Sequence, residues 1–167
     1  MSSHIDCRSV ALWRSITQGR AAENNPNNEF EIKVIFTDHQ GTLAALKTAG
    51  TLARQLRARI DLLVPQVVPF ALPLTRPPVS LGFSENHFLD LAYQGAQGPL
   101  DTFIQLYLCR DRRRCLLEVL KPQSLVVVGA RARWWPTEET KLARSLALAG
   151  HQVILADSRV GSFTLTF

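Results

Sequence analysis

The feature of this sequence that most constrains its fold is an alternation of strand-like and helix-like segments that begins at residue 30. Apolar runs rich in β-branched residues predict strands at residues 30–38, 60–68, 101–109, 124–130 and 151–157. Apolar residues at helical spacing predict helices between them, at residues 41–59, 84–95, 112–122 and 137–150. Strands that alternate with helices in this way form a parallel sheet with helices on both faces, so the predicted fold class is α/β and doubly wound.

The two ends of the chain depart from this alternation. Residues 1–29 have the character of an N-terminal extension and linker, because "SVALWRSITQ" predicts one short amphipathic helix and "ENNPNN" offers no core-forming side chain. The predicted α/β domain therefore covers residues 30–167. Its tail, "GSFTLTF", alternates apolar and polar residues as a half-buried strand does, and such a strand lies on the sheet edge or pairs with another copy of the chain.

Composition places the chain among soluble single-domain proteins. With 167 residues, of which 46% are hydrophobic and 20% charged, one core suffices without metal or disulfides. The three cysteines, Cys7, Cys109 and Cys115, are an odd number without metal or redox spacing, so we expect reduced thiols and a cytoplasmic location. No apolar run reaches the length of a transmembrane helix, and the N-terminus lacks the pattern of a signal peptide, so we expect no membrane association.

Three stretches of the sequence resemble the universal stress protein family. "VIFTD" followed by "GTLAALKTAGTLARQLRARIDLL" is similar to that family's first strand, its aspartate and its first helix. "LLEVLKPQSLVVVGARAR" resembles the segment around the family's fourth strand, and "AGHQVILAD" stands where the family has its last strand. The resemblance covers residues 31–157 and implies a five-stranded parallel sheet in the order 3-2-1-4-5, often with dimerisation through the last strand.

Some members of that family bind ATP, and their motif can be compared with this sequence. They place an aspartate at the end of the first strand and a G-x2-G-x9-G-[S/T] loop after the fourth, where backbone N–H groups surround the phosphates. Asp38 and Gly129 match this motif, but Ala132 replaces the second glycine, and Leu142 and Ala143 replace the final pair. The sequence therefore predicts no ATP binding in the family's mode.

The loop after the fourth predicted strand carries large side chains where the family has glycine. Arg131, Arg133, Trp134, Trp135 and Pro136 fill space that phosphates would need, and the proline also removes an N–H donor. The two tryptophans either stack on a base or, as we favour, pack over the end of the sheet or against a partner.

A second function remains open at the same crevice. Guanidinium groups bind phosphate and carboxylate well, so Asp38, Gly129, Arg131 and Arg133 could hold a nucleotide or another small anion, although we favour this less. Asp38 has an alternative role as the cap of the helix that follows it. Nucleic-acid binding through the Arg110–Arg114 run is not expected, because the run lacks interleaved aromatic residues.

The sequence shows no catalytic or metal-binding constellation. Its four histidines are scattered without HxH or HExxH spacing, and no GxSxG or Walker motif occurs. We therefore expect no enzyme, cofactor or metal, but a non-enzymatic stress-response or regulatory module that works through protein contacts, as a homodimer and with an unknown protein partner. The proline-rich stretch "VPFALPLTRPPVSLGF" is dense in apolar residues, which either cover the protein's own core or meet that partner.

Overall fold

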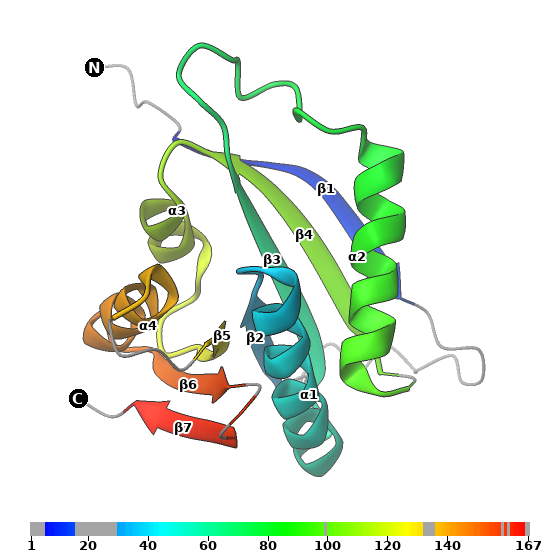
Figure 1. The fold of residues 1–167 in the computed structure, drawn as a ribbon, viewed down its shortest axis with the longest axis vertical. Coiled ribbons are helices and arrows are strands. Elements are labelled where there is room, and N and C mark those ends of the chain that lie inside the picture. The colour runs from blue at the N-terminus through cyan, green and yellow to red at the C-terminus, as the bar shows by residue number, and fades with distance from the viewer. Residues whose placement is uncertain are drawn as a thin grey trace.

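A computed structural model describes residues 6–15, 30–98, 100–131, 136–157, 159 and 161–165. Within these ranges the chain folds as an α/β protein with one twisted sheet (Figure 1). Its strands are β1 (Cys7–Ser15), β2 (Glu31–Ile35), β3 (Arg59–Val67), β4 (Thr102–Cys109), β5 (Leu125–Ala130), β6 (Gln152–Asp157) and β7 (Gly161–Leu165). Its helices are α1 (His39–Leu56), α2 (Leu81–Ala96), α3 (Arg112–Val119) and α4 (Glu138–Leu148).

The sheet is larger than the five strands that the sequence predicts. It has seven strands in the order β1-β4-β3-β2-β5-β6-β7. The five inner strands are parallel to one another, and β1 and β7 are added antiparallel at the two edges. The prediction of five strands is therefore corrected to seven, because both ends of the chain supply an edge strand.

The N-terminal segment is a strand, and the predicted helix over residues 9–18 is wrong for its described part. Val10, Ala11 and Trp13 pack against the core under α2, while the backbone of β1 pairs with β4 from Cys7 to Ser15. An isolated helix of this length is marginal in water, whereas an open sheet edge offers a backbone partner for every second residue. The tertiary partner therefore overrides the local helical pattern.

The C-terminal tail is also an edge strand, and it pairs with its own chain. Strand β7 runs antiparallel to β6, with Val153 opposite Leu165 and Asp157 opposite Gly161. Of the two alternatives left open by the sequence, the edge of the same sheet is the one observed. The edge of β6 is thus covered within the chain.

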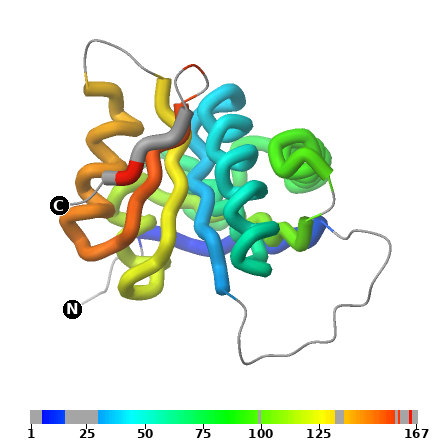
Figure 2. The backbone as a smooth tube through the Cα atoms, turned by 90° about the horizontal axis from the view of Figure 1, so that it is seen from below, coloured from blue at the N-terminus to red at the C-terminus, as the bar shows by residue number. Residues whose placement is uncertain are grey.

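Helices cover both faces of the sheet and divide the core into two layers. Helices α1 and α2 pack on one face with Ile32, Val34 and Leu62, and α3 and α4 pack on the other with Ile35 and Leu63. Figure 2 shows α1 and α4 on opposite sides of β5 and β6. None of the helices in the described ranges is long and apolar enough to cross a membrane.

Side-chain caps explain where the helices begin. Thr137 caps α4 by accepting a hydrogen bond from the N–H of Thr140 at 3.2 Å, as its sequence predicts. Helix α2 begins earlier than predicted, because its cap is Ser80 and not Ser84. Ser84 lies one turn inside the helix and is buried.

A buried group of charges lies on the α3 side of the sheet, at the amino ends of β2 and β3. The Lys33 ammonium donates to the carboxylates of Glu31, at 2.7 Å, and Asp61, whose side chain is only 3% exposed. The guanidinium of Arg59 pairs with the same two carboxylates. Burial alone would lower the pKa of Lys33, but hydrogen bonds to Asp61 and Glu31 outweigh it and raise that pKa.

Two of the three cysteines are joined, which corrects the prediction of three reduced thiols. Cys7 on β1 and Cys115 on α3 form a disulfide, and Cys109 is free and buried. The cysteines could not be paired from the sequence, because the two partners lie 108 residues apart and meet only when β1 docks beside β4. The bond ties the N-terminal strand to the helix that carries the arginine run.

The thiols give a direct test of this pairing. Burial raises the pKa of Cys109 to about 11, with Asp111 adding to the shift, so almost no thiolate is present near neutral pH. We expect native protein to react very slowly with a thiol reagent, unfolded non-reduced protein to show one thiol, and reduced unfolded protein to show three. Three thiols in unfolded protein that was never reduced would contradict the Cys7–Cys115 bond.

Candidate functional site

Three cavities open at the carboxyl edge of the parallel strands, where ligands bind in open α/β sheets. The switch pocket lies between β2 and β5 and is lined by Asp38, Gly129, Arg131, Pro136, Thr137, Glu138 and Glu139. The basic pocket lies between α3 and α4. The apolar pocket lies between the ends of β2 and β3 and helix α2.

The switch pocket brings together three of the four site residues predicted from the sequence. Asp38, Gly129 and Arg131 line one cavity of about 420 Å³, and Arg133 lies outside the described residues, as do both loop tryptophans. The Asp38 carboxylate accepts a hydrogen bond from the N–H of Gly41 at 2.7 Å and so caps α1. Arg131 approaches the same carboxylate, with Nε 3.8 Å from Oδ2.

Gly129 serves the contact between strand β5 and helix α1. A Cβ added to Gly129 would lie only 1.7 Å from the carbonyl oxygen of Gly41, so no other residue fits without moving the helix. The hydroxyl of Thr37 donates to the Gly129 carbonyl at 3.2 Å and tightens the same contact. Packing alone therefore accounts for glycine at this position, without a bound phosphate.

The charges of the described residues in the switch pocket do not favour an anion. Asp38, Glu138 and Glu139 line it, and among the lining residues that the structure describes Arg131 is the one cation. The pKa of Glu138 is lowered, chiefly by a hydrogen bond from Lys141, which keeps this carboxylate charged. From the described lining residues, a phosphate in this cavity would thus meet more negative than positive charge.

Comparisons of the chain with protein-family models, with curated proteins and with solved structures found no match. A function of this chain must therefore be argued from its own surface and its own cavities. The basic pocket contains part of the arginine run and the apolar pocket part of the proline-rich stretch, and both suit a ligand better than the switch pocket does.

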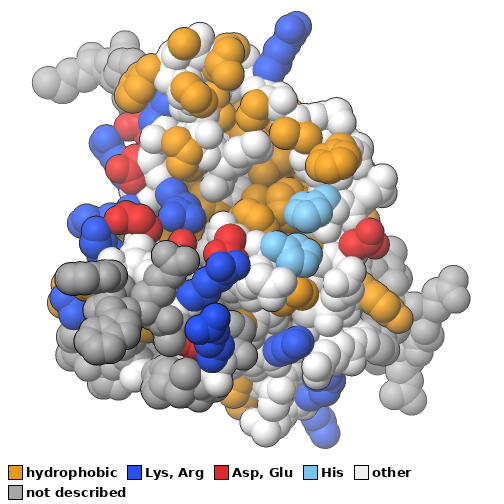
Figure 3. Space-filling model, in the orientation of Figure 1, with side chains coloured by type: hydrophobic (Ala, Val, Ile, Leu, Met, Phe, Trp, Pro, Cys, Tyr) orange, Lys and Arg blue, Asp and Glu red, His pale blue; other side chains and the backbone are white. Residues whose placement is uncertain are grey.

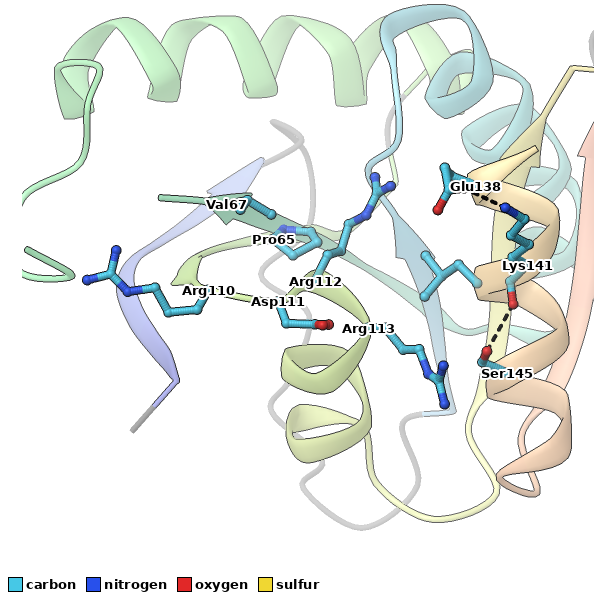
Figure 4. A pocket seen from close by; sticks show the side chains of 10 residues that line it. Pro65, Val67, Arg110, Asp111, Arg112, Arg113, Glu138, Lys141 and Ser145 are labelled. Atoms are coloured by element: carbon cyan, nitrogen blue, oxygen red, sulfur yellow. Dashed lines mark hydrogen bonds and ion pairs between the residues drawn. The ribbon is translucent and has the colours of Figure 1, made fainter. Parts of the chain in front are cut away.

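The basic pocket has a volume of about 450 Å³ and holds most of the arginine run (Figure 4). Arg110 points away from it and donates to the carbonyl oxygens of Val68 and Leu72, at 2.9 and 2.7 Å. Lys141 is paired with Glu138 at 2.8 Å. Within the described part of the chain, no hydrogen bond or ion pair engages the guanidinium of Arg112 or Arg113. Two cations in this pocket are therefore free to meet a ligand.

The apolar pocket has a volume of about 360 Å³, which is enough for a small organic ligand. Aromatic rings form much of its wall, and Arg112 is the one charged residue among the described residues that line it. Its lining residues are Phe36, Thr37, Val64, Pro65, Gln66, Val67, Val79, Phe83, Ser84, His87, Phe88 and Arg112. Because Arg112 lines both this pocket and the basic pocket, the two cavities meet at its side chain.

An exposed apolar surface surrounds the mouth of this pocket, and we call it the apolar edge. It consists of Val67, Phe70, Leu72, Val79, Leu81 and Phe83. Phe70 is 87% exposed and Phe83 66% exposed, so the proline-rich stretch does not cover the core with these side chains. Figure 3 shows apolar side chains gathered over the loop and the start of α2, with histidines beside them.

Arg110 holds the apolar edge in place. Besides its hydrogen bonds to the loop carbonyls, its guanidinium lies 5.1 Å from the centre of the Phe70 ring. Sequence reasoning treated Arg110 as part of a basic patch and missed this role. The apolar pocket itself had one signal in the sequence. Phe83 and His87 stand one helical turn apart, and their rings stack in the structure with centroids 6.4 Å apart.

Proposed function

We propose that this protein is a non-enzymatic regulatory module that works through protein contacts and binds its partner at the apolar edge. The observation that carries the proposal is the exposure of Phe70. Its ring is in contact with the Arg110 guanidinium and faces solvent instead of packing into the core. Contiguous exposed apolar surface with a polar rim is typical of sites of protein association.

The partner segment that fits this surface is apolar and acidic. Residues 67–83 contain one arginine, Arg76, and no aspartate or glutamate. Arg112 and Arg113 add free positive charge beside the same surface. A segment with apolar side chains flanked by carboxylates would therefore match both the shape and the charge of the apolar edge.

The proposal includes a relationship to the universal stress proteins. The order β4-β3-β2-β5-β6 of the parallel strands and the capping aspartate Asp38 after the first of them support that relationship. The proposal does not retain the cytoplasmic location, because that expectation rested on three reduced thiols, and Cys7 and Cys115 are joined in a disulfide of the kind typical of oxidising compartments. It does retain a homodimer, but not through β6, whose edge β7 occupies. A second copy could pair along the outer edge of β7, where no described strand lies.

Substituting Phe70 by serine is expected to abolish partner binding without loss of stability, because its side chain is almost fully exposed. The matched control is Leu148→Ser, which removes another exposed apolar side chain, 70% exposed, at the far end of α4. Both variants and the wild type would be used to capture proteins from extracts, at low and high salt.

The proposal requires that the wild type and L148S capture a protein that F70S does not capture. High salt should weaken the binding of that protein. Native mass spectrometry of the same three proteins would count subunits and separate a second copy from another partner. Identical capture by all three proteins, or binding that does not respond to salt, would contradict the apolar edge as the binding surface.

A further inference from the structure

We propose that the apolar pocket binds a small organic acid, with the apolar ring or chain among its aromatic side chains and the carboxylate on Arg112. This site goes beyond the proposed function and does not depend on it. Three observations carry it. They are the composition of the pocket, the lack of a hydrogen bond or ion pair from the Arg112 guanidinium to another described residue, and the junction of two cavities at that side chain.

The pocket wall suits the apolar part of such a ligand. Phe88 is buried and lies edge-on to Phe36, with ring centroids 5.2 Å apart, so these rings form a rigid wall. Phe83 and His87 lie on the same helix as Phe88 and present near-parallel rings that differ by 8° in orientation, and the His87 ring centroid is 5.1 Å from that of Phe88. Binding pockets for organic ligands are concave and mostly apolar, with a few polar groups that fix orientation, and this pocket has that composition.

The charge of the pocket suits one carboxylate. Among its described lining residues Arg112 is the one charged side chain, and no described aspartate or glutamate lines this pocket. An acidic influence comes from the basic pocket, where the hydrogen bond from Lys141 and, to a lesser degree, the charge of Arg112 lower the pKa of Glu138, without an ion pair between Arg112 and Glu138. Arg112 is partly buried, and no hydrogen bond or ion pair to another described residue engages its guanidinium. A guanidinium pairs with a carboxylate through two parallel hydrogen bonds, which one Arg can supply in full.

The position of Arg112 explains why the anion would lie at one end of the ligand. Its side chain extends beside Pro65, at the boundary between the apolar and basic pockets (Figure 4). A ligand in the apolar pocket therefore reaches positive charge only at that boundary. Polyanions such as nucleoside triphosphates are a poorer match, because a single cation lines the pocket.

The test is isothermal titration calorimetry with octanoate and 3-phenylpropanoate as probes, and with 1-octanol and 3-phenylpropanamide as uncharged counterparts. The variants are Arg112→Gln and, as the matched control, Arg113→Gln. Both arginines line the basic pocket, but only Arg112 lines the apolar pocket. Each substitution removes one positive charge, so the two variants have the same net charge, and both changes lie on the same helix, α3.

We expect the wild type to bind at least one of the two acids. R112Q should weaken that acid about ten-fold or more, the loss for one charge-assisted hydrogen bond, while R113Q should change it less than about two-fold. The uncharged counterparts should bind the wild type as weakly as the acids bind R112Q. Failure of both acids to bind at up to about 10 mM, or equal losses in R112Q and R113Q, would overturn the site.

Discussion

Replacing Gly129 by alanine is expected to destabilise the protein by about 3 kcal/mol or more, because the new methyl group collides with helix α1. A Cβ at this position lies 1.7 Å from the Gly41 carbonyl oxygen, and backbone atoms cannot move aside as the end of a side chain can. The helix must lift from strand β5, which loosens the layer of the core formed by α1 and α2. Urea unfolding of the ligand-free protein would measure the loss.

Two other glycines calibrate this result. Gly82 lies in α2 with nothing near its missing Cβ, so Gly82→Ala should leave stability unchanged or raise it by up to about 1 kcal/mol. A Cβ on Gly41 meets the Thr37 hydroxyl at 2.8 Å and the Gly129 carbonyl oxygen at 3.1 Å. The hydroxyl can rotate away at the cost of its hydrogen bond to Gly129, and the backbone contact is less severe than that at Gly129, so Gly41→Ala should fall between the other two variants. If G129A were as stable as the wild type without ligand, Gly129 would not be a packing residue.

Replacing the buried Asp61 by asparagine is expected to lower the free energy of unfolding by about 3 kcal/mol, because it leaves the largely buried cation Lys33 and the partly exposed Arg59 with too little negative charge. The Lys33 side chain is 11% exposed, so few water molecules can reach its ammonium group to replace the lost interaction with the carboxylate. For a protein of this size, that change would lower the melting temperature by roughly 6–12 °C. Differential scanning calorimetry would measure it.

Asp101 provides the matched control, because the same substitution there breaks a surface ion pair. Asp101 pairs with Arg14 at 2.9 Å, and the two side chains are 32% and 43% exposed. Exposed pairs of this kind contribute about 1 kcal/mol or less, so D101N should be close to the wild type. Equal effects of D61N and D101N would show that burial of the Lys33 group adds nothing. In the K33M/D61L double variant, most of the D61N loss should be absent.

The parts of the fold that the sequence predicted are those set by local signals. Thr137 caps α4 as expected, since a threonine before two glutamates specifies a helix start on its own. Strand β3 was predicted at 60–68 and spans Arg59–Val67, because a short run dominated by Ile, Leu and Val needs no distant partner to be recognised. Asp38 was predicted to have a possible capping role, and the hydrogen bond to Gly41 confirms it.

The parts that sequence reasoning missed depend on residues far apart in the chain. Strand β1 forms because β4 offers an open edge, and the Cys7–Cys115 bond follows from that docking. The apolar pocket draws on residues at the ends of β2 and β3, on the proline-rich loop, on α2 and on Arg112 of α3, and of these segments sequence reasoning singled out the loop and the arginine run but did not bring them together. In the switch pocket, Asp38, Gly129 and Arg131 line one cavity and Arg133 lies outside the described residues, but Gly129 has a packing role that only the distance to Gly41 reveals.

The place of β1 in the sheet has a consequence for how the chain is made on the ribosome. Residues 7–15 emerge early, but their partner is residues 102–109, and Cys115 follows after that. At synthesis rates of about 5–20 residues per second, the first strand waits roughly 5–20 s for its place in the sheet. During that interval Val10 and Trp13 have no core to join, so the N-terminus is where a nascent-chain chaperone would find exposed apolar side chains.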